Sequence, residues 1–134
     1  TAVVNLCFSG KTKSEIKKLL SLEAGVYSYL GTKDFREVEE RAFSGNDAEA
    51  EMIFRAFAYQ LAKDIGGMAA VLRFKVDAIV FTGGIAHSDR LCEEVTSYIG
   101  SIAQTIRIPG EEEMRSLAEG ALRVLHGQPA MEYV

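Results

Sequence analysis

The stretch from residue 76 to residue 88, VDAIVFTGGIAHS, constrains the fold of this chain more than any other part of the sequence. It begins with an apolar, β-branched run at 78–81, which predicts a strand buried on both faces. The glycine pair Gly83 and Gly84 follows and predicts a sharp turn, where little more than a hydrogen atom fits at Cβ. The segment therefore predicts a strand that leads directly into a tight turn.

A helix is expected directly after this turn. Ser88 or Asp89 can cap its N-terminus, and its apolar positions share one side at the helical period: Leu91, Cys92, Val95, Tyr98 and Ile99. A strand, a glycine turn and a helix can present backbone N–H groups to a ligand at the carboxyl edge of a sheet. The same arrangement also occurs as a plain turn without a ligand, and the glycine pair taken alone favours this second interpretation.

A second strand is expected at 102–108, parallel to the first, so that strand, helix and strand form a βαβ unit. Two strands make a marginal sheet, and parallel strands need further neighbours to cover them. The chain also begins without a methionine and with an apolar stretch. We therefore predict a helix-rich α/β fold with a partial parallel sheet, and we expect the rest of the sheet to belong to a part of the protein that this chain lacks.

Capping patterns and apolar periodicity predict the remaining helices. Three helix starts are marked by a capping residue with a glutamate three positions later: Thr12 and Glu15, Asp34 and Glu37, and Asn46 and Glu49. The longest helix is expected over 47–74, with these residues on its buried face: Ile53, Phe57, Leu61, Ile65, Met68, Ala69 and Leu72. A last helix is expected from 111–113 to near Gly127. The segment 24–31, bounded by glycines, is expected to be a connection or a short extended piece.

The charge and the cysteines exclude several classes of function. The formal net charge is −4, which argues against nucleic acid or an anionic membrane as the main partner. No apolar run approaches the roughly 20 residues that a membrane-spanning helix needs. Cys7 and Cys92 are far apart and show no zinc-ligand spacing, so neither a zinc site nor a disulfide framework is expected. A reducing cytoplasm fits this pattern best.

Besides the glycine turn, two groups can carry chemistry, each with a structural alternative, and His87 is a further candidate. Asp34 and Arg36 can hold ribose hydroxyls and an adenine or phosphate, or they can be a helix cap and a solvated cation, which the pair alone favours. A glutamate of 111–113 can bind a hydrated magnesium ion, or simply complement the dipole of its helix. His87 is a candidate acid–base group without a visible partner, and we place it at the rim of a pocket.

The order of these segments resembles the carboxyl-terminal part of the butyrate kinases, which belong to the acetate kinase group of the actin/hexokinase/Hsp70-like phosphotransferases. The matching segments cover nearly the whole chain, and their combination is more specific than any one of them: LCFSGK at 6–11, DFREVE at 34–39, AYQ at 58–60, IG at 65–66, FTGGI at 81–85, IPGEEEM at 108–114 and AEGALRVL at 118–125.

The resemblance implies a ribonuclease-H-like (actin-like ATPase) domain. Residues 1–127 would be the C-terminal part of the second of two kinase domains, on the nucleotide side of the cleft, and 128–134 a tail. The full-length enzyme would transfer the γ-phosphoryl group of ATP to a short-chain carboxylate, giving butanoyl phosphate and ADP from butanoate. The family's catalytic groups lie in the missing N-terminal part, so we expect no catalytic residue and no activity in this fragment. We also expect a homo-oligomer. The alternative is a non-catalytic module for nucleotide binding or assembly.

The resemblance also assigns binding residues. Asp34, Phe35 and Arg36 match the segment that lines the adenosine site. A second set matches the segment that lies against the base and the ribose: Gly83, Gly84, Ile85, Ala86, His87 and Ser88. Glu113 is the best match for the magnesium-associated glutamate, with Glu112 as the fallback. Acetate kinases usually carry Gly-Glu-Asn where this chain has Ala-His-Ser at 86–88, and this difference favours a butyrate kinase.

Overall fold

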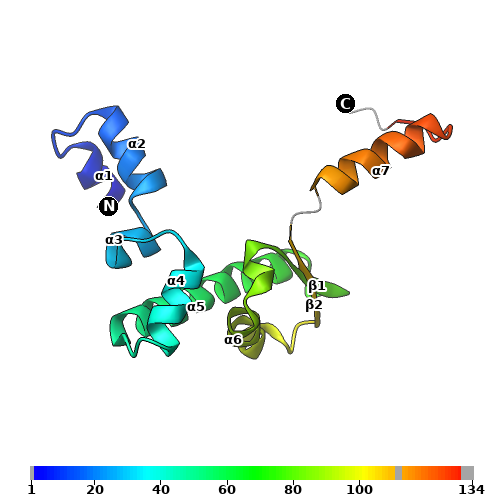
Figure 1. Ribbon diagram of the computed structural model, residues 1–134. Helices are drawn as coiled ribbons and strands as arrows, with labels where there is room; N and C mark the ends of the chain where they lie inside the picture. Colours follow the sequence, from blue (N-terminus) through cyan, green and yellow to red (C-terminus); the bar gives the residue numbers. More distant parts are fainter. Residues whose placement is uncertain (1, 111–112, 131–134) are drawn as a thin grey trace. The chain divides into compact units, whose positions relative to one another are not determined.

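The computed structural model describes residues 2–110 and 113–130, and for residues 113 and 114 it describes the backbone alone (Figure 1). The chain divides into two compact units, residues 1–64 and residues 65–134. The long helix α5, Ala48–Val71, starts in the first unit and ends in the second. In the described part of the chain, no helix has both the length and the apolar character needed to cross a membrane.

The first unit begins with four short helices: α1 (Ala2–Cys7), α2 (Lys13–Leu22), α3 (Val26–Leu30) and α4 (Phe35–Phe43). The predicted capping box of α2 is confirmed, with the Thr12 side chain and the Glu15 backbone and side chain bonded reciprocally. The predicted connection at 24–31 is wrong, because it contains α3. Gly25 and Gly31 both have φ of 68°, so the two glycines begin and end a helical turn and do not flank extended chain.

The start of α5 differs from the prediction by one residue. Asp47 caps the helix, because its Oδ1 accepts hydrogen bonds from the backbone N–H groups of Glu49 and Ala50 at 3.1 Å each. Asn46 has φ of 52° and belongs to the turn. The Asp47 carboxylate is also held by the Arg41 guanidinium at 2.8 Å, and this contact with α4 fixes the cap at Asp47.

The core of the first unit lies where α4 faces α5. Val38 and Phe54 are fully buried, and the ring of Phe54 lies between the rings of Phe35, at 5.3 Å, and Phe43, at 5.0 Å. The predicted face of α5 was partly wrong. Its buried positions include four that were not predicted: Ala50, Phe54, Ala58 and Ala62. Met68 and Leu72 were expected to be buried but are 64% and 55% exposed. Apolar residues surround most of α5, so periodicity alone could not select the face.

The second unit contains the predicted strand, helix and strand. Strand β1 (Ala78–Gly83) leads into the 3₁₀ helix η1 (Gly84–His87), α6 (Asp89–Ile99) and β2 (Gln104–Pro109). The strands are parallel, in a register that runs from Ala78 opposite Gln104 to Gly83 opposite Pro109. The buried face of α6 matches the prediction at Leu91, Cys92, Val95 and Ile99, whereas Tyr98 is 48% exposed. The last helix, α7 (Glu113–Leu125), is followed by Gly127 with φ of 89°, as expected.

The sheet is covered on one face. Phe81 is buried on one side of β1, whereas Val80 on the other side is 50% exposed. The expectation that β1 is buried on both faces is therefore wrong for this chain. Ile106 and Ile108 of β2 are also exposed, and so are apolar residues of α7: Leu117, Leu122, Val124 and Leu125. These surfaces have the composition of buried faces, because β-branched and leucine side chains dominate them.

Candidate functional site

The carboxyl ends of β1 and β2 meet at one edge of the sheet. Gly83 is the last residue of β1 and lies opposite Pro109 in the parallel register. The backbone N–H of Gly110 then donates to the carbonyl oxygen of Gly83 at 3.3 Å, which closes the edge with an antiparallel bridge. This is the edge at which parallel α/β sheets place their ligands. Segment 84–88 therefore starts at the same edge of the sheet at which Gly110 lies.

The two glycines of the turn play different parts. Gly83 has φ of 67° and ψ of −155°, a conformation that is essentially restricted to glycine. Gly84 lies at the start of η1, and a Cβ added there would meet no atom within 4 Å. The prediction of a turn that tolerates no side chain is therefore correct for the backbone of Gly83 and wrong for the space around Gly84. That space is open on the described surface of the chain.

Ser88 ends η1 and begins α6. Its Oγ accepts a hydrogen bond from the Leu91 backbone N–H at 3.0 Å, so Ser88 is the cap and Asp89 is the first helical residue. Its own backbone N–H donates to the Ile85 carbonyl at 3.1 Å. The side-chain oxygen of Ser88 is thus engaged in the architecture of the turn, and the cap fixes where segment 84–88 ends.

His87 lies beside Gly110. A Cβ on Gly110, whose φ is 91°, would be 3.9 Å from Nε2 of His87. His87 is exposed at this edge, and its place at the rim of a pocket remains a prediction. Gly110 directly precedes the glutamates at 111–113. Glu112 lies outside the described residues and so does the side chain of Glu113, so the predicted magnesium ligand remains a prediction. Within the described residues, no cluster of three or more His, Cys, Asp or Glu side chains could hold a metal ion.

Arg107 of β2 reaches the same turn and was missed in the sequence. Its Nη2 donates to the Ala86 carbonyl at 2.7 Å, and its Nη1 lies 2.5 Å from Oδ1 of Asp89. The hydrogen bond to Asp89 raises the pKa of the Arg107 guanidinium, so this residue stays cationic. The available signal was a single cation between Ile106 and Ile108, in an otherwise apolar strand.

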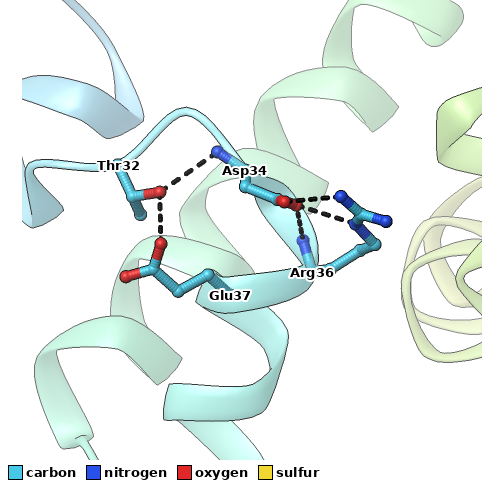
Figure 2. Close-up of polar contacts among 4 residues, drawn as sticks. All are labelled: Thr32, Asp34, Arg36 and Glu37. Carbon is cyan, nitrogen blue, oxygen red and sulfur yellow. Dashed lines mark hydrogen bonds and ion pairs between the residues drawn. The ribbon is translucent and has the colours of Figure 1, made fainter.

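The second candidate group lies in the first unit, at the start of α4 (Figure 2). Oδ1 of Asp34 accepts from the Arg36 backbone N–H at 3.0 Å, which confirms the predicted cap. The predicted reciprocal bond from Glu37 is wrong, because the Thr32 hydroxyl lies between the two residues. This hydroxyl accepts from the Asp34 backbone N–H at 3.2 Å and donates to Glu37 Oε2 at 2.6 Å.

Asp34 and Arg36 also form a two-point ion pair. The guanidinium of Arg36 donates through Nε to Oδ1 at 3.0 Å and through Nη2 to Oδ2 at 2.7 Å (Figure 2). These side-chain bonds, with the backbone bond from Arg36, lower the pKa of Asp34 to about 2. The Arg36 side chain is 91% exposed, so the outer face of the guanidinium is open to a ligand.

Phe35 is placed differently from its two neighbours. Its ring packs against Phe54 and, with centroids 4.6 Å apart, against Phe57. The side chain is half-buried, so a part of it contributes to the core of the first unit. Of the three residues predicted for the adenosine site, Asp34 and Arg36 therefore present polar groups at the surface, whereas Phe35 anchors their helix.

A shallow cavity of about 380 Å³ lies in the second unit next to Arg107. Its walls come from β1, α6 and β2: Phe81, Cys92, Glu93, Thr96, Ser97, Thr105 and Arg107. Burial raises the pKa of the Cys92 thiol, which donates a weak hydrogen bond to the Ile85 carbonyl at 3.8 Å. The thiol therefore contributes to packing beneath segment 84–88.

Two curated proteins are similar to this chain over nearly its whole length. The chain is 48% identical over 127 residues to a protein named probable butyrate kinase 2 from Caldanaerobacter subterraneus subsp. tengcongensis, which covers 94% of this chain and 36% of that protein. It is 44% identical over 133 residues to butyrate kinase 1 from Clostridium acetobutylicum, which covers 98% of this chain and 37% of that protein. The chain thus spans little more than a third of the length of these curated relatives.

The fold is shared with a solved structure as well. The crystal structure of Porphyromonas gingivalis acetate kinase matches 92% of this chain and 37% of its own chain, with a TM-score of 0.80 at 21% sequence identity. This supports the expected α/β fold of the actin-like ATPase type. The model of the acetokinase family matches residues 5–112, which is most of the chain. This chain belongs to the acetokinase family.

Proposed function

We propose that this chain is part of an ATP-dependent carboxylate kinase that phosphorylates butanoate, giving butanoyl phosphate and ADP. The observation that carries the proposal is the 44–48% identity to two proteins named as butyrate kinases, over 94–98% of this chain. Residues 1–127 are assigned to the C-terminal part of the second kinase domain, with 128–134 as a tail. A short-chain carboxylate, the remaining part of the same enzyme and a second copy of it are the proposed partners.

The adenine nucleotide is assigned to two groups of residues. The turn group comprises these residues: Gly83, Gly84, Ile85, Ala86, His87 and Ser88. Its position at the carboxyl edge of a parallel sheet and the open space around Gly84 support a flat ligand lying against the backbone. Asp34, Phe35 and Arg36 form the second group, and the exposed, two-point-bonded Arg36 supports contact with a base or a phosphate.

Magnesium is assigned to Glu113, with Glu112 as the fallback. Magnesium prefers a small number of carboxylate oxygens and keeps several waters, so one glutamate is sufficient for its protein contact. When bound, the ion neutralises charge that develops on the transferred phosphoryl group. Gly110, which directly precedes these glutamates in the sequence, lies at the same edge as Gly83 and His87, and this supports a metal position close to the nucleotide group.

The described residues are assigned to binding and orienting the adenine nucleotide, and the groups that transfer the phosphoryl group are assigned to the rest of the enzyme. The turn group would hold adenosine through backbone contacts, because the side chain of Ala86 is buried and that of Ser88 caps α6.

We place the enzyme in a reducing cytoplasm, which is supported by two free cysteines, Cys7 and Cys92.

The activity is tested with the full-length protein that contains this chain. Butanoate, ATP and magnesium are incubated with the enzyme, and acyl phosphate is trapped as its hydroxamate, with acetate and propanoate as competing substrates. We expect ATP-dependent butanoyl phosphate, absent when magnesium is removed with a chelator. The proposal fails if no short-chain carboxylate gives an acyl phosphate. Nucleotide binding without any acyl phosphate would favour a non-catalytic binding module.

A further inference from the structure

Arg107 connects three elements around the turn. It comes from β2, where it lies opposite Phe81 in the register, and its guanidinium binds the carbonyl of Ala86 in η1 and the carboxylate of Asp89 in α6. Both contacts are made with neighbouring Nη atoms, at 2.7 and 2.5 Å. The side chain is 36% exposed, so its contacts are partly shielded from water. One residue of β2 thus holds both the end of η1 and the beginning of α6.

The Ala86 carbonyl needs such a donor. The last carbonyl groups of a helix have no partner within the helix, and η1 is four residues long. The Ile85 carbonyl accepts from the Ser88 backbone N–H and from the Cys92 thiol. The Ala86 carbonyl accepts from Arg107, and the Ala86 residue is fully buried. An unpaired carbonyl at a buried residue is costly, so without Arg107 the end of η1 would have to move towards water.

We propose that Arg107 is a positioning residue that holds segment 84–88 in the conformation that binds the adenine nucleotide. The inference rests on the proposed function, because the ligand is the nucleotide assigned to the turn group. Arg107 acts through the backbone of Ala86 and does not touch the ligand. In the nucleotide-free enzyme, segment 84–88 is thereby already held in the conformation that binds the nucleotide. Binding then costs less conformational entropy.

The two contacts of Arg107 stabilise segment 84–88 to different degrees. The side chain of Asp89 is 79% exposed, and an ion pair with so exposed a partner contributes little. The bond to the Ala86 carbonyl is charge-assisted and lies at a buried residue, so it carries most of the positioning. Asp89→Asn should therefore change amide exchange in segment 84–88 and KM for ATP only slightly, whereas Arg107→Met should change both strongly. Lysine keeps the charge but lacks the planar fork, so the changes in Arg107→Lys should be smaller than those in Arg107→Met.

The test uses the full-length enzyme and two readouts. Hydrogen exchange measures the amides of residues 85–91, which report the local conformation without any ligand. Kinetics measure KM for ATP and kcat at saturating ATP. Arg107→Met should speed exchange in this segment and raise KM for ATP roughly threefold to tenfold, with kcat changed less. Arg123→Met, an exposed arginine of α7, is the matched control and should change neither readout.

The outcomes separate the possible roles. If Arg107→Met lowers the melting temperature but leaves local exchange and KM as in the wild type, Arg107 is a purely structural residue and the inference is overturned. Unchanged values for all three measurements overturn it as well. If the wild-type enzyme has no affinity for ATP, the proposed function fails, while the exchange data still decide whether Arg107 holds segment 84–88.

Discussion

The glycine that ends β1, Gly83, and the glycine that follows it, Gly84, should respond to the same substitution by different amounts. Gly83 has φ of 67° and ψ of −155°, so alanine there places Cβ in a region that side chains avoid. We expect Gly83→Ala to lower the free energy of unfolding by about 1–3 kcal/mol, the usual cost of such a conformation. The antiparallel bridge from Gly110 to the Gly83 carbonyl holds this backbone, so relaxation to another conformation would break it.

Gly84 should behave differently. Its φ is not positive and nothing lies within 4 Å of an added Cβ, so Gly84→Ala should change the free energy of unfolding by less than about 1 kcal/mol. Both variants are measured by urea denaturation, with changes read at constant m-value. Equal destabilisation by the two substitutions would contradict the assignment of the strained position to Gly83.

Because the space around Gly84 is open, a larger side chain there can test nucleotide binding without disturbing the fold. Gly84→Val in the full-length enzyme should raise KM for ATP severalfold with little loss of kcat, because the added side chain would occupy the space assigned to the base and ribose. Gly67→Val is the matched control, since Gly67 also has nothing within 4 Å of its Cβ and lies in α5. An unchanged KM for Gly84→Val, with normal folding, would mean that the nucleotide does not pack against this turn.

Three further predictions concern the first unit and the isolated chain. Arg36→Met should raise the pKa of Asp34 from about 2 towards its usual value, as measured by NMR titration. Because the folded-state pKa is lowered, Asp34 stabilises the fold above about pH 4, and this contribution is lost as the pH falls through about 2. Phe54→Ala should cost about 3–5 kcal/mol of unfolding free energy, and a loss below 1 kcal/mol would contradict its place between two rings. The 134-residue chain alone should form no butanoyl phosphate in the hydroxamate assay.

Local chemistry made the order of elements predictable. The strand before Gly83 and the cap at Asp34 depend on residues close in sequence, and both are as predicted. For the cap of α6 the sequence offered Ser88 or Asp89, and the structure selects Ser88. The cap of α5 was not predictable in this way. Asn46 and Asp47 are both good caps, and the choice between them depends on Arg41 in the preceding helix.

Features that depend on tertiary contacts were harder to predict. The buried face of α5 is set by the rings of α4 around Phe54, and a helix that is apolar on most sides does not reveal it. The turn at the glycine pair was predicted, but which of the two glycines adopts a conformation restricted to glycine depends on the bridge to Gly110. Arg107 was missed because its partners, Ala86 and Asp89, are 21 and 18 residues away in sequence.

The most direct test of the account is photoaffinity labelling of the full-length enzyme with 8-azido-ATP and magnesium, followed by mass spectrometry of the peptides. The account predicts labels within residues 83–88 and at 34–36, both prevented by excess ATP. If the labels that excess ATP prevents all lie outside these two segments, the assignment of the adenosine site to residues 83–88 and 34–36 is contradicted.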